Sequence, residues 1–233
     1  HMHARAGLVT PYLSDEFMHC VRVCCEKAKQ EDMLAWLYDE DRYPSGPAGG
    51  IVTADPAFTR RYVRVTPYAN GDSRAKQAQR GYERAQDSRL LAIYDIVLDE
   101  NGFLKSAARL TRPQEAQGQA WYAYFECCPA SHGANQSYVD TLNPRAIEQF
   151  ARVTYDRYRE AVGDYFGTVC PAMFTDEPQY PANTTLAFAR DQTDVILPWT
   201  DDLCQTYAQA YHQPLLDVLP ELVWNLPNGA LSQ

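Results

Sequence analysis

The amino-acid sequence predicts an α/β protein in which parallel strands alternate with helices. Met33–Tyr38 and Val169–Thr175 are apolar runs of strand length, and each is followed by carboxylates and then a proline. Segments with the apolar spacing of helices lie before and between these runs. This alternation is typical of a parallel sheet or barrel, and parallel barrels carry their active sites at the carboxyl ends of the strands.

The first helix is expected over residues 14–30. Ser14 suits the N-cap position, and Asp15 and Glu16 follow it in the first turn, where the helix dipole favours acidic side chains. Met33–Tyr38 then has the nearly continuous apolar composition of a buried strand. Residues 44–50 contain two prolines and three glycines, so a tight loop is expected after the carboxylates.

Residues 51–112 have a different pattern. Arg60–Pro67, Leu90–Leu98 and Phe103–Leu110 have strand composition, and residues 99–102 form a hairpin-turn sequence between the last two. We therefore predict a single domain over residues 1–233, with an antiparallel β-rich insertion at about 51–112.

The remaining segments return to the alternating pattern. Trp121–Cys128 is predicted to be a buried strand. Asn143 and Pro144 suit the cap and the first position of a helix that ends near residue 163. A last helix is expected over residues 200–212, with Thr200 as its cap.

Composition and charge exclude several classes of partner. The chain has 233 residues, 45% of them hydrophobic, and a formal net charge of -9. An acidic surface repels phosphate backbones, so no nucleic-acid partner is expected. The sequence has no apolar run of the ~20 residues that a membrane span needs, so no membrane partner is expected either. His1 and Met2 are interpreted as a cloning remnant, with the native chain starting near His3.

The seven cysteines predict reduced thiols. Their number is odd and their spacing irregular, which argues against a disulfide framework and favours a cytoplasmic location. The adjacent pairs Cys24-Cys25 and Cys127-Cys128 are poorly spaced for one tetrahedral ion, so no zinc site is predicted.

Glu177 is the strongest candidate for catalysis. It follows an apolar strand and precedes Pro178, which places it at the strand's carboxyl end. A carboxyl group that is partly desolvated there has a raised pKa and acts as a general acid. Glycoside cleavage needs such an acid and a second carboxylate. The alternative interpretation is that residues 176–178 only end a strand and cap a helix.

Asp39, Glu40 and Asp41 form the second group of carboxylates. They are candidates for hydrogen bonding to sugar hydroxyls, or for holding a hard cation such as calcium; apart from that cation no cofactor is predicted. The alternative is a loop held by acid–arginine pairs, since Arg42 is adjacent.

Further substrate-binding residues are expected near these acids. Tyr38 and Tyr43 flank them and Trp199 lies in the loop after Glu177, so all three are candidates for stacking on a sugar. The other candidates are Glu126 near a strand end, His132 in the loop after it, and Asp176. The sequence contains no GxGxxG, P-loop, HExxH or GxSxG motif, which disfavours nucleotide, zinc-protease and serine-hydrolase functions.

Several sequence blocks together resemble a known family. These are MHARAGLVTPYLSDEF (2–17), WLYDEDRYPSGPAGG (36–50), TLNPRAIEQFARVTYDRYREAVGDYFG (141–167), FTDEP (174–178) and LPWTDDL (197–203). They resemble the catalytic-barrel region of glycoside hydrolases related to the family 106 α-L-rhamnosidase group, in the order found there.

The resemblance implies a fold and a role for one residue. It implies a (β/α)8 barrel whose first four strands are Met2–Gly7, Met33–Tyr38, Trp121–Cys128 and Val169–Thr175, with Glu177 as general acid at the fourth. Only about four of eight strands are present, so the expected fold is a partial (half) TIM-type barrel with an antiparallel insertion. Open edges of a half barrel favour a homo-oligomer such as a dimer, unless a C-terminal half is missing.

The expected function is therefore that of a glycoside hydrolase, or a fragment of one, acting on a carbohydrate by carboxylate general acid/base chemistry. One alternative is a non-catalytic carbohydrate-binding or self-assembling half barrel. Another is a metal-dependent sugar isomerase or lyase that uses Glu177, Asp39 and His132 around a divalent ion.

Overall fold

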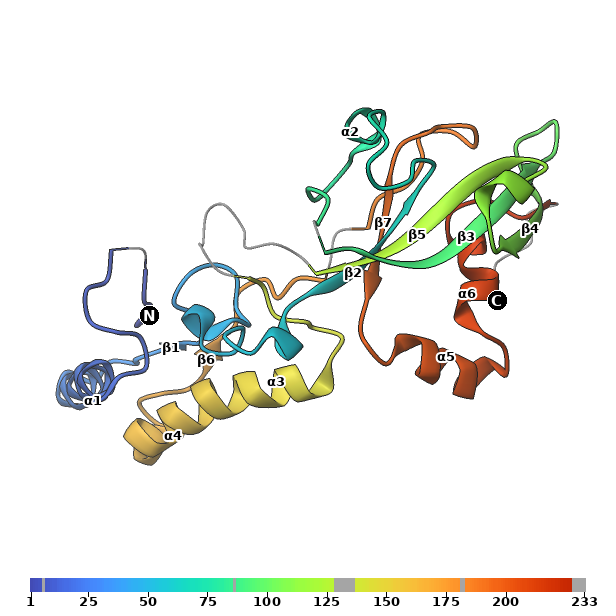
Figure 1. Cartoon of the computed structure of the whole chain (residues 1–233). Helices are drawn as coiled ribbons and strands as arrows, with labels where there is room; N and C mark the ends of the chain where they lie inside the picture. The colour runs from blue at the N-terminus through green and yellow to red at the C-terminus, as the bar shows by residue number, and fades with distance from the viewer. Residues whose placement is uncertain (6, 86, 128–136, 181–182, 228–233) are drawn as a thin grey trace. The chain divides into compact units, whose positions relative to one another are not determined.

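The chain folds as two compact units, each built from two separate segments. A computed structural model describes residues 1–5, 7–85, 87–127, 137–180 and 183–227 (Figure 1). The first unit comprises His1–Arg60 and Ala130–Tyr180, and the second comprises Arg61–Pro129 and Pro181–Gln233.

The first unit contains a small parallel sheet. Strand β1 (Leu37–Tyr38) pairs with β6 (Met173–Phe174), with Leu37 opposite Met173. Met2 adds a parallel bridge to the other side of Leu37. The pairing continues beyond the two strands, because the Asp39 amide donates to the Phe174 carbonyl at 3.2 Å.

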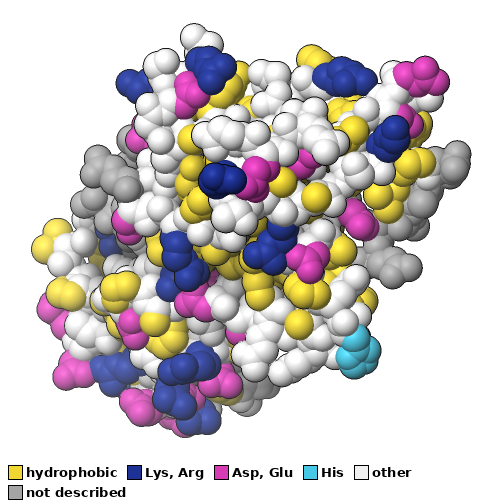
Figure 2. Space-filling model, turned by 45° about the vertical axis from the view of Figure 1, so that its right-hand side comes forward, with side chains coloured by type: hydrophobic (Ala, Val, Ile, Leu, Met, Phe, Trp, Pro, Cys, Tyr) yellow, Lys and Arg dark blue, Asp and Glu magenta, His cyan; other side chains and the backbone are white. Residues whose placement is uncertain are grey.

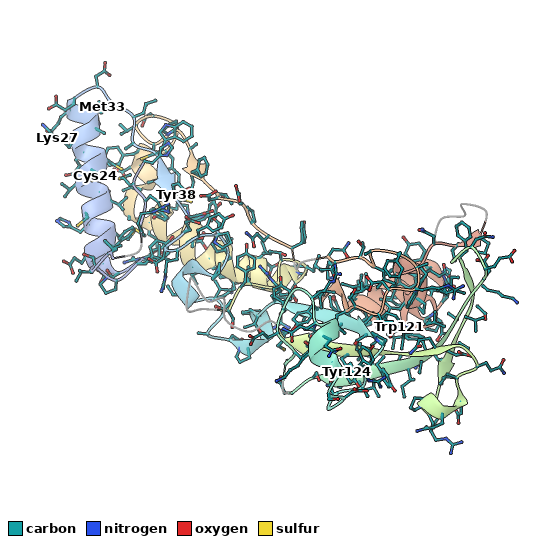
Figure 3. All side chains as sticks on the ribbon, turned by 90° about the horizontal axis from the view of Figure 1, so that it is seen from above. Cys24, Lys27, Met33, Tyr38, Trp121 and Tyr124 are labelled. Carbon is teal, nitrogen blue, oxygen red and sulfur yellow. The ribbon has the colours of Figure 1, made fainter. Side chains whose placement is uncertain are left out.

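Helix α1 (Asp15–Gln30) packs its apolar side into this unit. The Ser14 side chain accepts a hydrogen bond from the Phe17 amide at 3.2 Å, which confirms the predicted cap. Phe17 and Val21 are buried, whereas Cys24, labelled in Figure 3, lies on the exposed side. The Cys25 thiol is buried 3.3 Å from the Cys170 thiol, so the helix contacts the segment that leads into β6.

A second helical segment begins at Pro144. Helix α3 (Pro144–Ala151) continues through a π-helical turn at Arg152–Asp156 into α4 (Arg157–Val162). Asn143 caps it by accepting from the Arg145 amide, as predicted. Within the widened turn, the Thr154 hydroxyl donates to the Phe150 carbonyl at 2.6 Å. Such turns are often found at functional sites.

The second unit is built on a five-stranded antiparallel sheet, with the strand order β4-β3-β5-β2-β7. The strands are β2 (Arg61–Thr66), β3 (Arg89–Leu98), β4 (Leu104–Leu110), β5 (Gln119–Cys127) and β7 (Val195–Trp199). The predicted strands at β2, β3 and β4 are confirmed. So is the turn between β3 and β4, where Gly102 has a φ of 88°.

Both faces of this sheet are covered. On one face, Trp121 meets Trp224 edge-on at 4.8 Å, beside helices α5 (Leu203–Tyr211) and α6 (Leu215–Val218). The other face lies under residues 68–85, which include the short helix α2 (Ala75–Ala78). Figure 3 labels Trp121 and Tyr124, which are separated by two residues on β5 and therefore lie on opposite faces.

The predicted half TIM-type barrel is wrong. Trp121–Cys128, expected as a third parallel strand, instead contributes β5, which lies between β3 and β2 in the antiparallel sheet. The apolar pattern misled because a strand covered on both faces has the same composition in either direction. The strand predicted at Met33–Tyr38 is also shorter than expected, since β1 begins at Leu37 and Met33 and Leu34 are each 62% exposed.

The cap predicted for the last helix is wrong by two residues. Asp202, not Thr200, occupies the N-cap position of α5.

The prediction of a homo-oligomer rested on the open edges of a half barrel, and self-association stays a prediction.

The face under residues 68–85 contains a buried ion network. The Arg64 guanidinium donates to Glu126 at 3.1 Å and to Asp194 at 2.8 Å, and all three side chains are fully buried. It also donates to the Tyr82 carbonyl at 2.7 Å. Arg64 therefore neutralises two acids and fastens the covering segment to the sheet.

We expect Arg64→Leu to lower the free energy of unfolding of the second unit by roughly 3–5 kcal/mol, because buried Glu126 loses its cation and buried Asp194 keeps only its pair with Arg84. Urea unfolding followed by tryptophan fluorescence measures this, since three of the four tryptophans belong to this unit. The control is Arg109→Leu, which breaks the exposed pair with Asp217 and should cost less than about 1 kcal/mol. Equal losses in the two variants would contradict the role given to Arg64.

Candidate functional site

Two acidic segments meet at the carboxyl end of the small parallel sheet. Residues 39–41 follow β1 and residues 175–177 follow β6. Because the strands are parallel, both segments leave the sheet at the same end. The predicted acids Asp39, Glu40, Asp41, Asp176 and Glu177 therefore belong to one cluster, here called the strand-end cluster.

Asp39 is the buried centre of the strand-end cluster. Its carboxylate is fully buried and accepts three hydroxyl hydrogen bonds. The donors are Ser45 at 2.5 Å, Thr175 at 2.6 Å and Tyr155, from the π-helical turn, at 2.7 Å. With three hydroxyl donors already bound, buried Asp39 joins three parts of the unit and has a structural role in the cluster.

The loop after β1 is fastened to the segment after β6. The Ser45 amide donates to the Asp176 carbonyl at 3.0 Å, and the Ser45 hydroxyl accepts from the Asp176 amide at 2.8 Å. The Tyr138 hydroxyl donates to the Ser45 carbonyl at 2.6 Å and accepts from the Gln179 amide. These bonds fix the backbone on which the outer carboxylates sit.

Glu177 is the exposed carboxylate of the strand-end cluster. Its backbone has a φ of 37°, in the left-handed region that is uncommon for a residue other than glycine. The Tyr43 hydroxyl donates to its carboxylate, and this hydrogen bond raises the pKa of Tyr43. A residue held in this uncommon conformation, with an oriented and accessible carboxylate, fits a functional role.

Asp176 is bound from the other side of the cluster. The Tyr38 hydroxyl donates to its carboxylate at 2.5 Å, and burial together with this bond raises the pKa of Tyr38. Figure 3 labels Tyr38 at the end of β1. Its ring stacks on Phe174 with the centroids 4.9 Å apart, so the paired strands also position the hydroxyl.

Glu40 is buried, with 1% of its surface exposed. Burial, with the neighbouring charges of Asp176 and Asp39, raises its pKa to about 7, while Arg5 opposes the shift. One carboxyl oxygen lies 2.8 Å from Nε2 of His3. Burial and Arg5 lower the pKa of His3, against the opposing charge of Asp176.

Asp41 lies beside an open pocket of about 320 Å³, which is within the range of small-ligand sites. Arg42 pairs with Asp41 at 2.8 Å, so the predicted acid–arginine alternative describes this one carboxylate. Arg5, Tyr12, Ala48 and Gly49 also line the pocket. These groups offer hydrogen-bond donors and acceptors at the edge of the strand-end cluster.

Not every predicted residue belongs to this cluster. Tyr43 does, through Glu177. Glu126 and Trp199 belong to the second unit, where Glu126 is bound by Arg64 and Trp199 is buried in the core. His132 lies outside the described residues.

The structure adds residues that sequence reasoning missed: His3, Ser45, Tyr155 and Thr175. Thr175 is adjacent in sequence to a predicted acid, and Ser45 lies in the loop after the first acidic group. Tyr38, predicted as a stacking residue, donates its hydroxyl to Asp176. Tyr155 and His3 come from segments distant in the sequence, and only the tertiary structure shows that they contact Asp39 and Glu40.

The comparisons leave the identity open. No family model, curated protein or solved structure matches this chain.

Within the described ranges, no group of three or more His, Cys, Asp or Glu side chains is arranged to hold a metal ion. No helix among the residues placed by the structure has both the length and the apolar character needed to cross a membrane. On the face drawn in Figure 2, acidic and basic side chains lie next to one another.

We expect Tyr155→Phe to destabilise the first unit by about 2 kcal/mol, because buried Asp39 loses one of three hydroxyl donors. Hydrogen exchange of the α1 amides measures opening of this unit. Tyr180→Phe, at an exposed position in the same unit, is the control and should leave exchange unchanged. Unchanged exchange in Tyr155→Phe would show that Asp39 does not depend on this bond.

We expect Glu40→Gln to change how stability depends on pH. The folded-state pKa of about 7 lies above the ordinary value of 4.5, so the folded protein binds the proton more tightly and loses stability as the pH rises through this interval. Glutamine has no such proton, so the variant should gain roughly 3 kcal/mol relative to the native chain between pH 4.5 and 8.

Hydrogen exchange of α1 at pH 4.5 and 8, corrected for the intrinsic exchange rate, tests this expectation. Glu16→Gln, at an exposed position of α1, is the control and should follow the native chain. A parallel pH dependence in Glu40→Gln and the native chain would show that Glu40 ionises like an ordinary glutamate.

Proposed function

We propose that the first unit binds a carbohydrate at the strand-end cluster and hydrolyses a glycosidic bond there. The observation that carries this proposal is the parallel pairing of β1 with β6, which brings two acidic segments to one place. Glu177 is the carboxylate that faces the substrate, because it is exposed and Tyr43 orients it.

The chemistry requires two carboxyl groups in different protonation states. The cluster supplies contrasting environments, which is how carboxyl groups acquire distinct acid and base roles. Glu40 is buried with a pKa of about 7, whereas Glu177 is exposed to solvent. The open pocket lined by Asp41 and Arg42, at the start of the loop after β1, gives a sugar ring a place to bind.

The family resemblance supports the same proposal. Residues 36–50 and 174–178, which carry its most specific motifs, are the segments that form the strand-end cluster. Membership of the family 106-related glycoside hydrolases is part of this proposal. The barrel expected from the resemblance is not.

The thiols support a reducing compartment. The described cysteines at positions 20, 24, 25, 127, 170 and 204 are free. Free buried thiols such as Cys25 and Cys170 favour the cytoplasm, and we propose that location.

Hydrolysis of a panel of aryl glycosides, including rhamnosides and galactosides, tests the function. We expect Glu177→Gln to lower kcat/KM by about 10²–10⁴-fold, the usual contribution of a positioned acid or base. Glu16→Gln is the matched control, because Glu16 is exposed on α1 of the same unit. Sugar binding without hydrolysis would instead favour a carbohydrate-binding protein, and neither binding nor hydrolysis would contradict the proposal.

A further inference from the structure

The hydrogen bonding of Glu40 identifies where a proton lies. The side chain is 2% exposed, and its only described partner is Nε2 of His3, 2.8 Å from Oε1. Oε2 is buried and has no hydrogen-bond partner among the described residues. An ionised carboxylate offers about four acceptor sites, and burying it with one partner is costly.

A neutral carboxyl group fits this geometry better. If Oε1 carries the proton, it donates to Nε2 of a neutral imidazole, and only one carbonyl oxygen remains without a partner. This arrangement requires His3 to carry its own proton on Nδ1. The contact then joins a neutral acid to a neutral base and buries no net charge.

The charges around Glu40 favour the same assignment. Asp39, Asp41 and Asp176 face it from the ends of β1 and β6, and Arg5 faces it from the N-terminal segment. Asp39 receives three hydroxyl donors and Asp176 receives the Tyr38 hydroxyl, whereas Glu40 receives no hydroxyl from the described residues. The carboxyl group with the fewest donors is the one that keeps a proton when carboxylates crowd together. Its raised pKa agrees with this.

His3 connects this buried proton with the outside of the unit. Its ring stacks on Tyr38, with 3.6 Å between centroids and 5° between planes, which fixes its orientation. The side chain is 13% exposed, and Nδ1 makes no hydrogen bond with the part of the chain that the structure describes. Nε2 of His3 therefore contacts Glu40, and Nδ1 is available to a further partner.

We propose that Glu40 and His3 form a proton relay that supplies the acid for the strand-end cluster, with Glu177 as the base. This inference rests on the proposed function. His3 touches the substrate and is the catalytic acid, and Glu40 is a positioning residue that stores the proton behind it.

Hydrolysis through this relay breaks one C–O bond, forms another and moves three protons. The glycosidic C–O bond breaks and its electron pair stays on the leaving oxygen, which takes the proton from Nδ1 of His3. Nε2 takes the proton from Glu40, which is left ionised. A water molecule adds to the sugar carbon and gives its proton to Glu177. Glu177 then releases that proton to solvent, Nδ1 of His3 takes one from solvent, and Nε2 returns its proton to Glu40.

Nuclear magnetic resonance of the whole chain tests the proton assignment without a substrate. With ¹³C-labelled glutamate, the signal that is lost in Glu40→Gln should titrate near pH 7. With ¹⁵N-labelled histidine, the signal that is lost in His3→Gln should show a neutral ring protonated on Nδ1. Titration of Glu40 near the ordinary glutamate value, or a proton on Nε2 of His3 at neutral pH, would overturn the relay.

Kinetics test the role in catalysis on any glycoside that the chain hydrolyses. We expect His3→Gln and Glu40→Gln to lower kcat by about 10²–10⁴-fold for poor leaving groups, and much less for activated aryl groups that need no proton. The basic limb of the pH profile near 7 should disappear in Glu40→Gln. His19→Gln, exposed on α1, is the control.

The two experiments separate the two proposals. Unchanged leaving-group and pH dependence in both variants would overturn the relay while hydrolysis itself stands. If no glycoside is hydrolysed, the proposed function fails, and the resonance titration still decides for or against the protonated Glu40–His3 pair.

Discussion

The backbone pairing of β1 with β6 is the interaction on which the first unit depends. Its hydrogen bonds include the Leu37 amide to the Ala172 carbonyl and the Asp39 amide to the Phe174 carbonyl. These bonds join segments that are more than 130 residues apart in the chain. Because the pairing is parallel, both segments turn outward at the same end, and the carboxylates that follow each strand gather there.

Carboxylates that lie close together repel one another unless each is stabilised by hydrogen-bond donors, a cation or a proton. In the first unit, Asp39 is surrounded by hydroxyl donors, Asp41 pairs with Arg42, and Glu40 lies against His3. In the second unit, two buried acids share Arg64. In the second unit, the charges of Arg64 and its two acids are held in a buried network. In the first unit, the Glu177 carboxylate stays accessible, which is what chemistry on a bound molecule requires.

Several local features were predictable because neighbouring residues determine them. Ser14 caps α1, Asn143 and Pro144 begin α3, and the turn at residues 99–102 joins β3 to β4. The position of the acids after β1 and β6 was predictable too, because an apolar run followed by charge marks where a strand ends. In these cases the sequence by itself contained the deciding information.

Only the tertiary structure decided which strands pair and in which direction. An apolar run indicates burial, but β5 has the same composition whether its neighbours are parallel or antiparallel. That choice placed Glu126 and Trp199 in the antiparallel sheet of the second unit. It also brought His3 to Glu40 and Tyr155 to Asp39, contacts between distant segments that no local pattern encodes. Local chemistry therefore determined the ends of the elements, and long-range pairing determined the site.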